Sequence, residues 1–486
     1  MHFGAVLFVL GSLMSILGVA LWLPMVVAYF ISTDTLFEMS QFFGLGATSA
    51  IGLTLGQFIR FMTKESAEKV GVREGFAIVS LAWLVMSLLG MLPYLLSGIT
   101  FSVTDAFFET MSGFTTTGAT VFTEIEIMPA GILVWRSMTQ WLGGMGIVVL
   151  SIALLPILGV GGYRLMKAET PGGVAYERET PRITDAAKEL WILYVVFTAV
   201  LMVILFLLGM SPLDAICHGF TTLATGGFST HTESVGYFES SAIHWVIILF
   251  MLIGGLNFSL YSQLLRWKFR FLLRDIELRA FLFIISLGVV IGMVVIPTTG
   301  DFWIDLRDTV FQVVTLATSS GFVTVDYNTW PVMMLTVLIV LMFIGGCMGS
   351  TSGGMKMMRV LVFGKTVTRE LHRMLYPHGV RPVRVGPKVI KPEVVANIMA
   401  FGCVYSFSFI VGIFVMTMSG YDLITASSAS VSVLSNMGPA LGAVGPAENW
   451  AHLPDITKWV MSFLMLMGRL ELFSVVILFT PWVWRK

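Results

Sequence analysis

The sequence predicts an all-α polytopic membrane protein, in which a two-helix hairpin precedes four parallel helix–pore loop–helix repeats around a central pore. Three observations predict this fold. Of the 486 residues, 56% are hydrophobic and only 12% are charged, whereas soluble proteins carry about 25% charged residues. Ten apolar runs are long enough to cross a bilayer. Four of the segments between these runs resemble one another.

The ten apolar runs are expected to be membrane spans. They cover residues 3–30, 42–62, 75–96, 132–158, 191–210, 244–265, 278–296, 333–363, 394–418 and 459–484. The first run has neither a basic stretch before it nor an A-x-A cleavage site after it. We therefore expect it to be a retained span and not a signal peptide.

Basic residues indicate the orientation of the spans. Most of the 29 Lys and Arg residues lie in 60–73, 164–188, 266–279, 359–391 and the last two positions. The alternate segments 32–41, 97–130, 211–243, 297–331 and 419–455 contain one, Arg307, and are acidic instead. Because cytoplasmic segments are enriched in Lys and Arg, we expect a multi-pass protein of the bacterial inner membrane with both termini in the cytoplasm.

The four similar segments lie on the predicted outer side. They read TDAFFETMSGFTTTGAT (104–120), LDAICHGFTTLATGGFST (213–230), RDTVFQVVTLATSSGFVT (307–324) and YDLITASSASVSVLSNMGPALG (421–442). Aspartate favours the N-terminus of a helix, and the apolar stretch that follows is too short to span. A half-helix that re-enters the membrane and ends in Gly can present backbone carbonyls to a cation, as in potassium channels.

The predicted filter glycines are Gly118, Gly226, Gly321 and Gly438. They follow the aspartates at 105, 214, 308 and 422 by 13, 12, 13 and 16 residues. The candidate cation site comprises Thr116, Thr117, Gly118, Ala224, Thr225, Gly226, Ser319, Ser320, Gly321, Asn436, Met437 and Gly438. Such Gly- and Thr-rich patches also serve tight helix packing, but four of them on one side favour a filter.

At these residues the chain resembles the Trk/Ktr/HKT family of potassium transporters, in particular its bacterial TrkH/TrkG subunits. The resemblance extends to the hairpin 1–66, to GGCMGSTSGGMK (345–356) and to MGRLE (467–471). It implies potassium uptake, a homodimer with one pore per protomer, and a cytoplasmic TrkA-type nucleotide-binding regulatory ring. It implies no cofactor in this chain. The TVGYG string of potassium channels is absent and Met437 and Pro439 flank the fourth glycine, so we expect less strict selection against sodium.

The run 333–363 is longer than the about 20 residues that a span needs. Five of the ten residues from 345 to 354 are glycine, which is a poor helix former. We expect a break in the helix that forms a gate under the filter. The predicted gate residues are Gly345, Gly346, Gly349, Gly353, Gly354, Lys356 and Arg469. A glycine packing face within a tilted helix is the alternative for the run.

Arg469 lies within the last apolar run, where a charge is costly and usually functional. We expect it on the pore wall opposite the gate, where its charge opposes cation leak; an ion pair with Glu471 is the alternative. Arg136 and Gln140 are expected to brace a pore helix, and Glu109 and His218 to be buried structural residues.

The predicted units are 1–66, 67–170, 171–272, 273–391 and 392–486, which are the hairpin and the four repeats. A proton- or sodium-coupled secondary cation transporter is the alternative function, and it predicts inverted repeats. An enzyme is not expected, because the seven histidines form no cluster with acidic residues. The net charge is zero, so the sequence lacks the excess of basic residues that is typical of proteins that bind nucleic acid.

Overall fold

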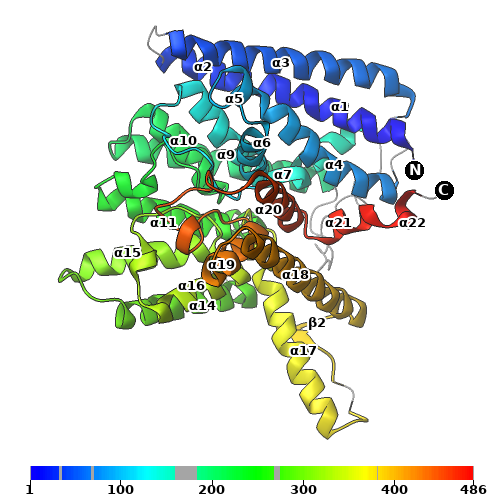
Figure 1. Ribbon diagram of the computed structural model, residues 1–486. Helices are drawn as coiled ribbons and strands as arrows, with labels where there is room; N and C mark the ends of the chain where they lie inside the picture. The colour runs from blue at the N-terminus through cyan, green and yellow to red at the C-terminus, as the bar shows by residue number, and fades with distance from the viewer. Residues whose placement is uncertain are drawn as a thin grey trace.

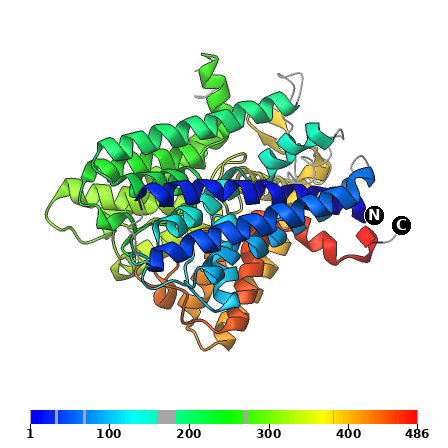
Figure 2. The same ribbon diagram turned by 90° about the horizontal axis from the view of Figure 1, so that it is seen from above.

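The computed structural model describes residues 2–31, 36–66, 71–158, 183–267, 274–379 and 381–484, and most of them are helical (Figure 1). The N-terminal hairpin pairs α1 (Phe3–Ala20) and α2 (Trp22–Ile31) with α3 (Leu36–Thr63). Its arms lie side by side across one face of the molecule (Figure 2). A Cβ added to Gly11 would lie 2.8 Å from the carbonyl oxygen of Gly56, so these glycines allow the two helices to approach closely.

Each of the four repeats contains a first helix, a pore helix and a second helix. The first helices are α4 (Val72–Gly90, followed by α5, Leu92–Leu96), α9 (Ile183–Leu207), α14 (Ile276–Val295) and α18 (Pro392–Met418). The pore helices are α6 (Val103–Phe114), α10 (Pro212–Leu223), α15 (Phe302–Ala317) and α19 (Leu423–Leu434). The second helices are α7 (Ala130–Leu158), α11 (Ser241–Gly255) with α12 (Phe258–Leu265), α16 (Val332–Ile344) with α17 (Met357–Leu375), and α20 (Asp455–Arg469) with α21 (Phe473–Val476) and α22 (Pro481–Trp484).

The repeats follow one another around a circle. Each pore helix packs against the second helix of the preceding repeat: α10 against α7, α15 against α11, and α19 against α16. The first pore helix, α6, packs against α20 of the last repeat and so closes the circle. This arrangement confirms the predicted all-α architecture.

The predicted spans 244–265 and 459–484 are wrong as continuous helices. Six helical stretches in the described part of the chain are long and apolar enough to cross a membrane, and eight are if each of two bent pairs is one span. The bent pairs are α11 with α12, at 98°, and α20 with the helical segment 473–479, at 113°. Asn257 caps α12, and Glu471 and Leu472 both have positive φ, so the chain turns at these points.

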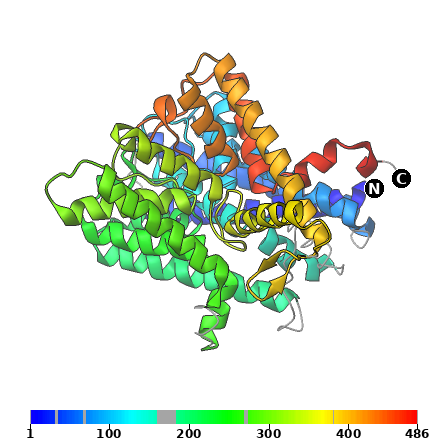
Figure 3. The ribbon, with the colours of Figure 1, turned by 90° about the horizontal axis from the view of Figure 1, so that it is seen from below.

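The break predicted in 333–363 is confirmed, because α16 ends at Ile344 and α17 begins at Met357. Beyond the break, α17 extends away from the other helices together with the hairpin of β1 (Arg384–Val385) and β2 (Lys388–Val389) (Figures 1 and 3). The hairpin pairs Arg384 with Val389. Residues 164–182 of the other long basic segment lie outside the described residues.

The two described ends of the chain lie together (Figure 1). The rings of Phe3 and Trp484 are stacked with centroids 6.1 Å apart. The segment after the bend at Glu471 packs against α4 and reaches the start of the N-terminal hairpin at Trp484.

Candidate ion pathway

Four residues with left-handed backbone mark the ends of the pore helices. Thr116, Thr225, Ser319 and Asn436 have φ of 52° to 54°. Two residues after each stands a glycine with φ between 78° and 90°: Gly118, Gly227, Gly321 and Gly438. Positive φ is uncommon outside glycine and is found where the surrounding structure enforces it. The same backbone conformation has therefore been built four times from four different sequences.

In the second loop it is Gly227, and not the predicted Gly226, that has the positive φ of the glycines in the other loops. Gly227 has φ of 81°, and the preceding left-handed residue, Thr225, aligns with Thr116. Ala224 is then the C-cap residue that follows α10, and it lies before the segment 225–227. The four segments are 116–118, 225–227, 319–321 and 436–438. Two adjacent glycines made the choice ambiguous in the sequence.

The fourth loop aligns with the first two once its helix start is known. In the third loop Asp301 caps α15 and lies 20 residues before Gly321 (301 to 321), so this pore helix is about one turn longer. The side chains of Ser102, Ser211 and Asp422 cap α6, α10 and α19, and each lies 16 residues before the filter glycine (102 to 118, 211 to 227, 422 to 438). Asp422 is thus the cap itself. Hydrogen bonds from Thr425, chiefly from its hydroxyl, lower the pKa of this carboxyl group.

The four filter segments form a closed ring. A Cβ added to Gly438 would lie 2.6 Å from the carbonyl oxygen of Thr117 in the first loop. A Cβ on Gly118 would lie even closer to the carbonyl oxygen of Gly226. In the same way Gly227 approaches Ser320, and Gly321 approaches Met437. Each glycine therefore meets the carbonyl group that precedes the glycine of the next loop, and no side chain fits between them.

A polar side chain supports the chain after the filter in three of the loops. Glu109, His218 and Gln312 each lie nine residues before the filter glycine. Glu109 accepts hydrogen bonds from the hydroxyl of Thr120 at 3.0 Å and the N–H of Val121 at 2.9 Å. His218 Nε2 lies 3.0 Å from the Ser229 hydroxyl, and Gln312 Nε2 donates to the Thr324 hydroxyl at 3.1 Å. The fourth loop has Ala429 at this position.

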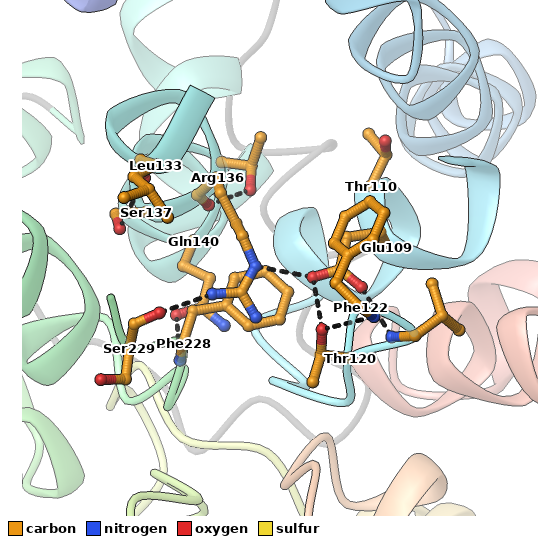
Figure 4. A network of polar contacts seen from close by, with 12 residues as sticks. Glu109, Thr110, Thr120, Phe122, Leu133, Arg136, Ser137, Gln140, Phe228 and Ser229 are labelled. Atoms are coloured by element: carbon orange, nitrogen blue, oxygen red, sulfur yellow. Dashed lines mark hydrogen bonds and ion pairs between the residues drawn. The ribbon is translucent and has the colours of Figure 1, made fainter. Parts of the chain in front are cut away.

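Arg136 of α7 connects the first two loops (Figure 4). Its Nε lies 2.7 Å from Glu109 Oε1, and both side chains are almost fully buried. Its Nη1 donates to the carbonyl oxygen of Ser229 at 2.8 Å. Its guanidinium lies over the ring of Phe228, 3.7 Å from the centroid. Arg136 thus braces the first pore helix through Glu109, and Glu109 is buried.

The predicted gate, residues 345–356, lies against the inner ends of the filter segments. The N–H of Gly353 donates to the Ser319 hydroxyl at 2.6 Å. The Thr225 hydroxyl donates to that of Thr351 at 3.2 Å, and Thr351 donates in turn to the carbonyl of Leu223, the last residue of α10, at 3.1 Å. Thr351 and Ser352 are buried. The loop therefore bonds to two of the four left-handed residues of the ring.

Glycines and Lys356 shape this loop. Gly345, Gly349 and Gly354 have positive φ, as does Lys356. A Cβ on Gly345 would lie 2.9 Å from the Cα of Gly354, so the two ends of the loop meet closely. Gly346 faces Ser352, and Gly353 faces the carbonyl of Ser435. Lys356 Nζ lies within hydrogen-bonding distance of the Ser352 carbonyl oxygen.

The family model described as "TrkH: Cation transport protein" matches residues 44–485. The chain is 38% identical to the Trk system potassium uptake protein TrkH of Salmonella typhimurium, over all of both chains. It is 41% identical to the TrkH of Halomonas elongata, over 90% of this chain and 92% of that one. This chain belongs to the TrkH family. The crystal structure of the potassium transporter TrkH from Vibrio parahaemolyticus matches it with a TM-score of 0.88 and 35% identity, over all of both chains.

Arg469 of this TrkH-family chain bonds to the gate loop. Its Nη1 donates to the carbonyl oxygen of Thr351 at 2.7 Å. Its Nη2 donates to the carbonyl oxygen of Gly144 in α7 at 2.8 Å and also bonds to that of Gly143. Glu471, the partner considered from the sequence, pairs with Arg359. Arg469 therefore links the loop to the second helix of the first repeat.

Sequence reasoning missed Glu277 of α14. Its Oε1 accepts hydrogen bonds from the N–H of Met348 at 2.7 Å and from the N–H of Met358 at 3.0 Å. One buried carboxyl group thus holds both a residue early in the predicted gate, 345–356, and the start of α17. In the sequence Glu277 is a charged residue at the end of a predicted span, which is a common position for one. Nothing in the sequence therefore indicated its contacts with Met348 and Met358.

Proposed function

We propose that this chain carries potassium ions across the bacterial inner membrane through the ring of filter segments 116–118, 225–227, 319–321 and 436–438. The observation that carries the proposal is the cyclic contact of each filter glycine with the next loop. A ring of backbone carbonyls can replace the hydration shell of a cation. The relatives from Salmonella typhimurium and Halomonas elongata are named potassium uptake proteins, which supports potassium as the ion.

Residues 345–356 are the proposed gate. The loop bonds to the inner end of the ring at Ser319 and Thr225, where it would obstruct an ion leaving the filter. It continues directly into α17, which extends away from the bundle. A movement of α17 would therefore pull on the loop. We assign that movement to a cytoplasmic TrkA-type regulatory ring that carries the nucleotide, and we expect the chain to work as a homodimer.

The test is rubidium or potassium uptake into liposomes that contain the purified chain, with sodium as competitor. Gly118→Ser and Gly227→Ser place a side chain against the carbonyl of the next loop. We expect each to reduce the preference for potassium over sodium roughly tenfold or to abolish uptake, because the ring cannot close. Gly364→Ser on α17 is the control, since a Cβ there meets nothing within 4 Å. An unchanged ion preference in both filter variants would remove the ring from the pathway.

A further inference from the structure

The contacts that hold the ring from behind differ between repeats. The equivalent glycines Gly143, Gly254 and Gly468 of the second helices face the carbonyls of Phe114, Leu223 and Leu434, the last residues of their pore helices. Three residues before them stand Gln140, Met251 and Met465, all fully buried. At this position the first repeat therefore has the polar amide of Gln140, whereas the second and fourth repeats have the thioether of a methionine.

The Gln140 amide bonds to both sides of a filter glycine. Its Nε2 donates to the carbonyl oxygen of Gly226 at 2.6 Å. Its Oε1 accepts the N–H of Phe228 at 3.1 Å. The two bonded peptide groups flank Gly227, the filter glycine of the second loop. Gln140 thus pairs with this segment as a neighbouring β-strand would, and it fixes the direction of the Gly226 carbonyl.

The same segment is held again two residues further on. Arg136, one turn before Gln140 on α7, bonds to the carbonyl of Ser229 and lies over the ring of Phe228. Glu109 from the first pore helix holds Arg136 in turn (Figure 4). Residues 226–229 are therefore anchored to the first repeat by two neutral hydrogen bonds from Gln140 and by a charge-assisted hydrogen bond and a cation–π contact from Arg136. A charge-assisted hydrogen bond is about twice as strong as a neutral one.

We propose that Gln140 is a specificity-determining residue of the filter, which keeps the second loop from moving inward around a small cation. This inference rests on the proposed function. Sodium is smaller than potassium, and a ring that can contract binds it better. The four filter glycines contact four carbonyl groups, those of Thr117, Gly226, Ser320 and Met437. Holding one of the four at a fixed distance limits the contraction of the whole set.

The experiment compares Gln140→Met with the wild-type chain in liposomes, measuring potassium and sodium uptake separately. Methionine is the residue at the equivalent position of two other repeats, so it suits the packing of this site. Methionine removes both hydrogen bonds to the second loop. If the bond that orients the Gly226 carbonyl is the one that bears on the choice of ion, the ratio of potassium to sodium uptake should fall roughly three- to tenfold. Potassium uptake itself should stay within about twofold of wild type, since the ring remains closed.

Ser137→Ala is the control on the same helix, because the Ser137 hydroxyl donates to the Leu133 carbonyl at 3.0 Å and its other partner is the Cys217 thiol of α10, which lies outside the four ring segments. It should leave the ratio unchanged. If Gln140→Met does not reach the membrane, Gln140→Asn decides, since its shorter amide cannot reach both partners and should lower the ratio as well. A wild-type ratio in a folded Gln140 variant overturns the inference but leaves the proposed function intact. If neither the wild-type chain nor a chain freed of its gate contacts by Arg469→Ala takes up potassium, the proposed function is overturned instead.

Discussion

Replacement of Arg469 by alanine tests whether this side chain keeps the gate loop closed. The variant loses the bond from Nη1 to the Thr351 carbonyl, which at 2.7 Å is a short bond from a charged donor. Such bonds contribute about 1.5–3 kcal/mol. If that free energy favours the closed loop, its loss raises the ratio of open to closed loops about ten- to hundredfold. Basal potassium uptake without the regulatory ring should rise by a similar factor until the open state dominates.

The assay is rubidium uptake into liposomes that contain the purified chain alone, at matched protein density. Arg469→Lys separates two explanations of the effect. It keeps the positive charge, but an ammonium group lacks the planar fork that reaches Thr351 and Gly144 together. A tether predicts increased uptake for the lysine variant, whereas a purely electrostatic barrier predicts uptake at the wild-type level.

Thr336→Ala on α16 serves as the control, because its hydroxyl is exposed and bonds within its own helix to Val332. It should leave uptake unchanged. If folded Arg469→Ala and Arg469→Lys both take up rubidium at the wild-type rate, the loop is not held by Arg469 and the argument from its hydrogen bonds fails.

Two further predictions concern the ends of the gate loop and the docking of a partner. Glu277→Leu removes the acceptor shared by the N–H groups of Met348 and Met358, so basal rubidium uptake should rise several-fold. Glu277→Gln keeps an acceptor oxygen and should show a smaller rise. Equal uptake by the leucine variant and the wild-type chain would contradict this role of Glu277. Arg381→Glu combined with Arg384→Glu reverses two exposed charges at the hairpin beyond α17. This double variant should reduce co-purification of a TrkA-type ring at least tenfold, while basal rubidium uptake is retained. Full recovery of the ring would place the docking surface elsewhere.

The four pore loops could be predicted because their signals are local. A capping Ser or Asp, a short apolar stretch and a glycine define each loop within about twenty residues. The register of the second loop could not be predicted, because Gly226 and Gly227 are chemically identical candidates. What distinguishes them is the left-handed backbone of Thr225, which no helix or turn propensity favours for a threonine.

The breaks in the second helices were predicted unevenly for a similar reason. The run 333–363 was too long for one span, so its glycines stood out. The run 244–265 has the right length for a single span. Its length therefore gave no indication of the break at Asn257. The bonds of Arg469 to Thr351 and of Glu277 to Met348 join residues 118 and 71 positions apart. Such contacts depend on the packing of whole repeats and leave no periodic pattern in the sequence.

The closure of the ring between its last and first segments has a consequence for biosynthesis. Gly438 packs against Thr117, and the Asn436 side-chain amide donates to the Thr117 hydroxyl at 3.1 Å. The ribosome synthesises Thr117 early, with the first repeat, and Asn436 and Gly438 late, with the fourth repeat. A nascent chain that has inserted three repeats still lacks one wall of the filter, so no selective pathway exists until the final quarter of the polypeptide has left the ribosome.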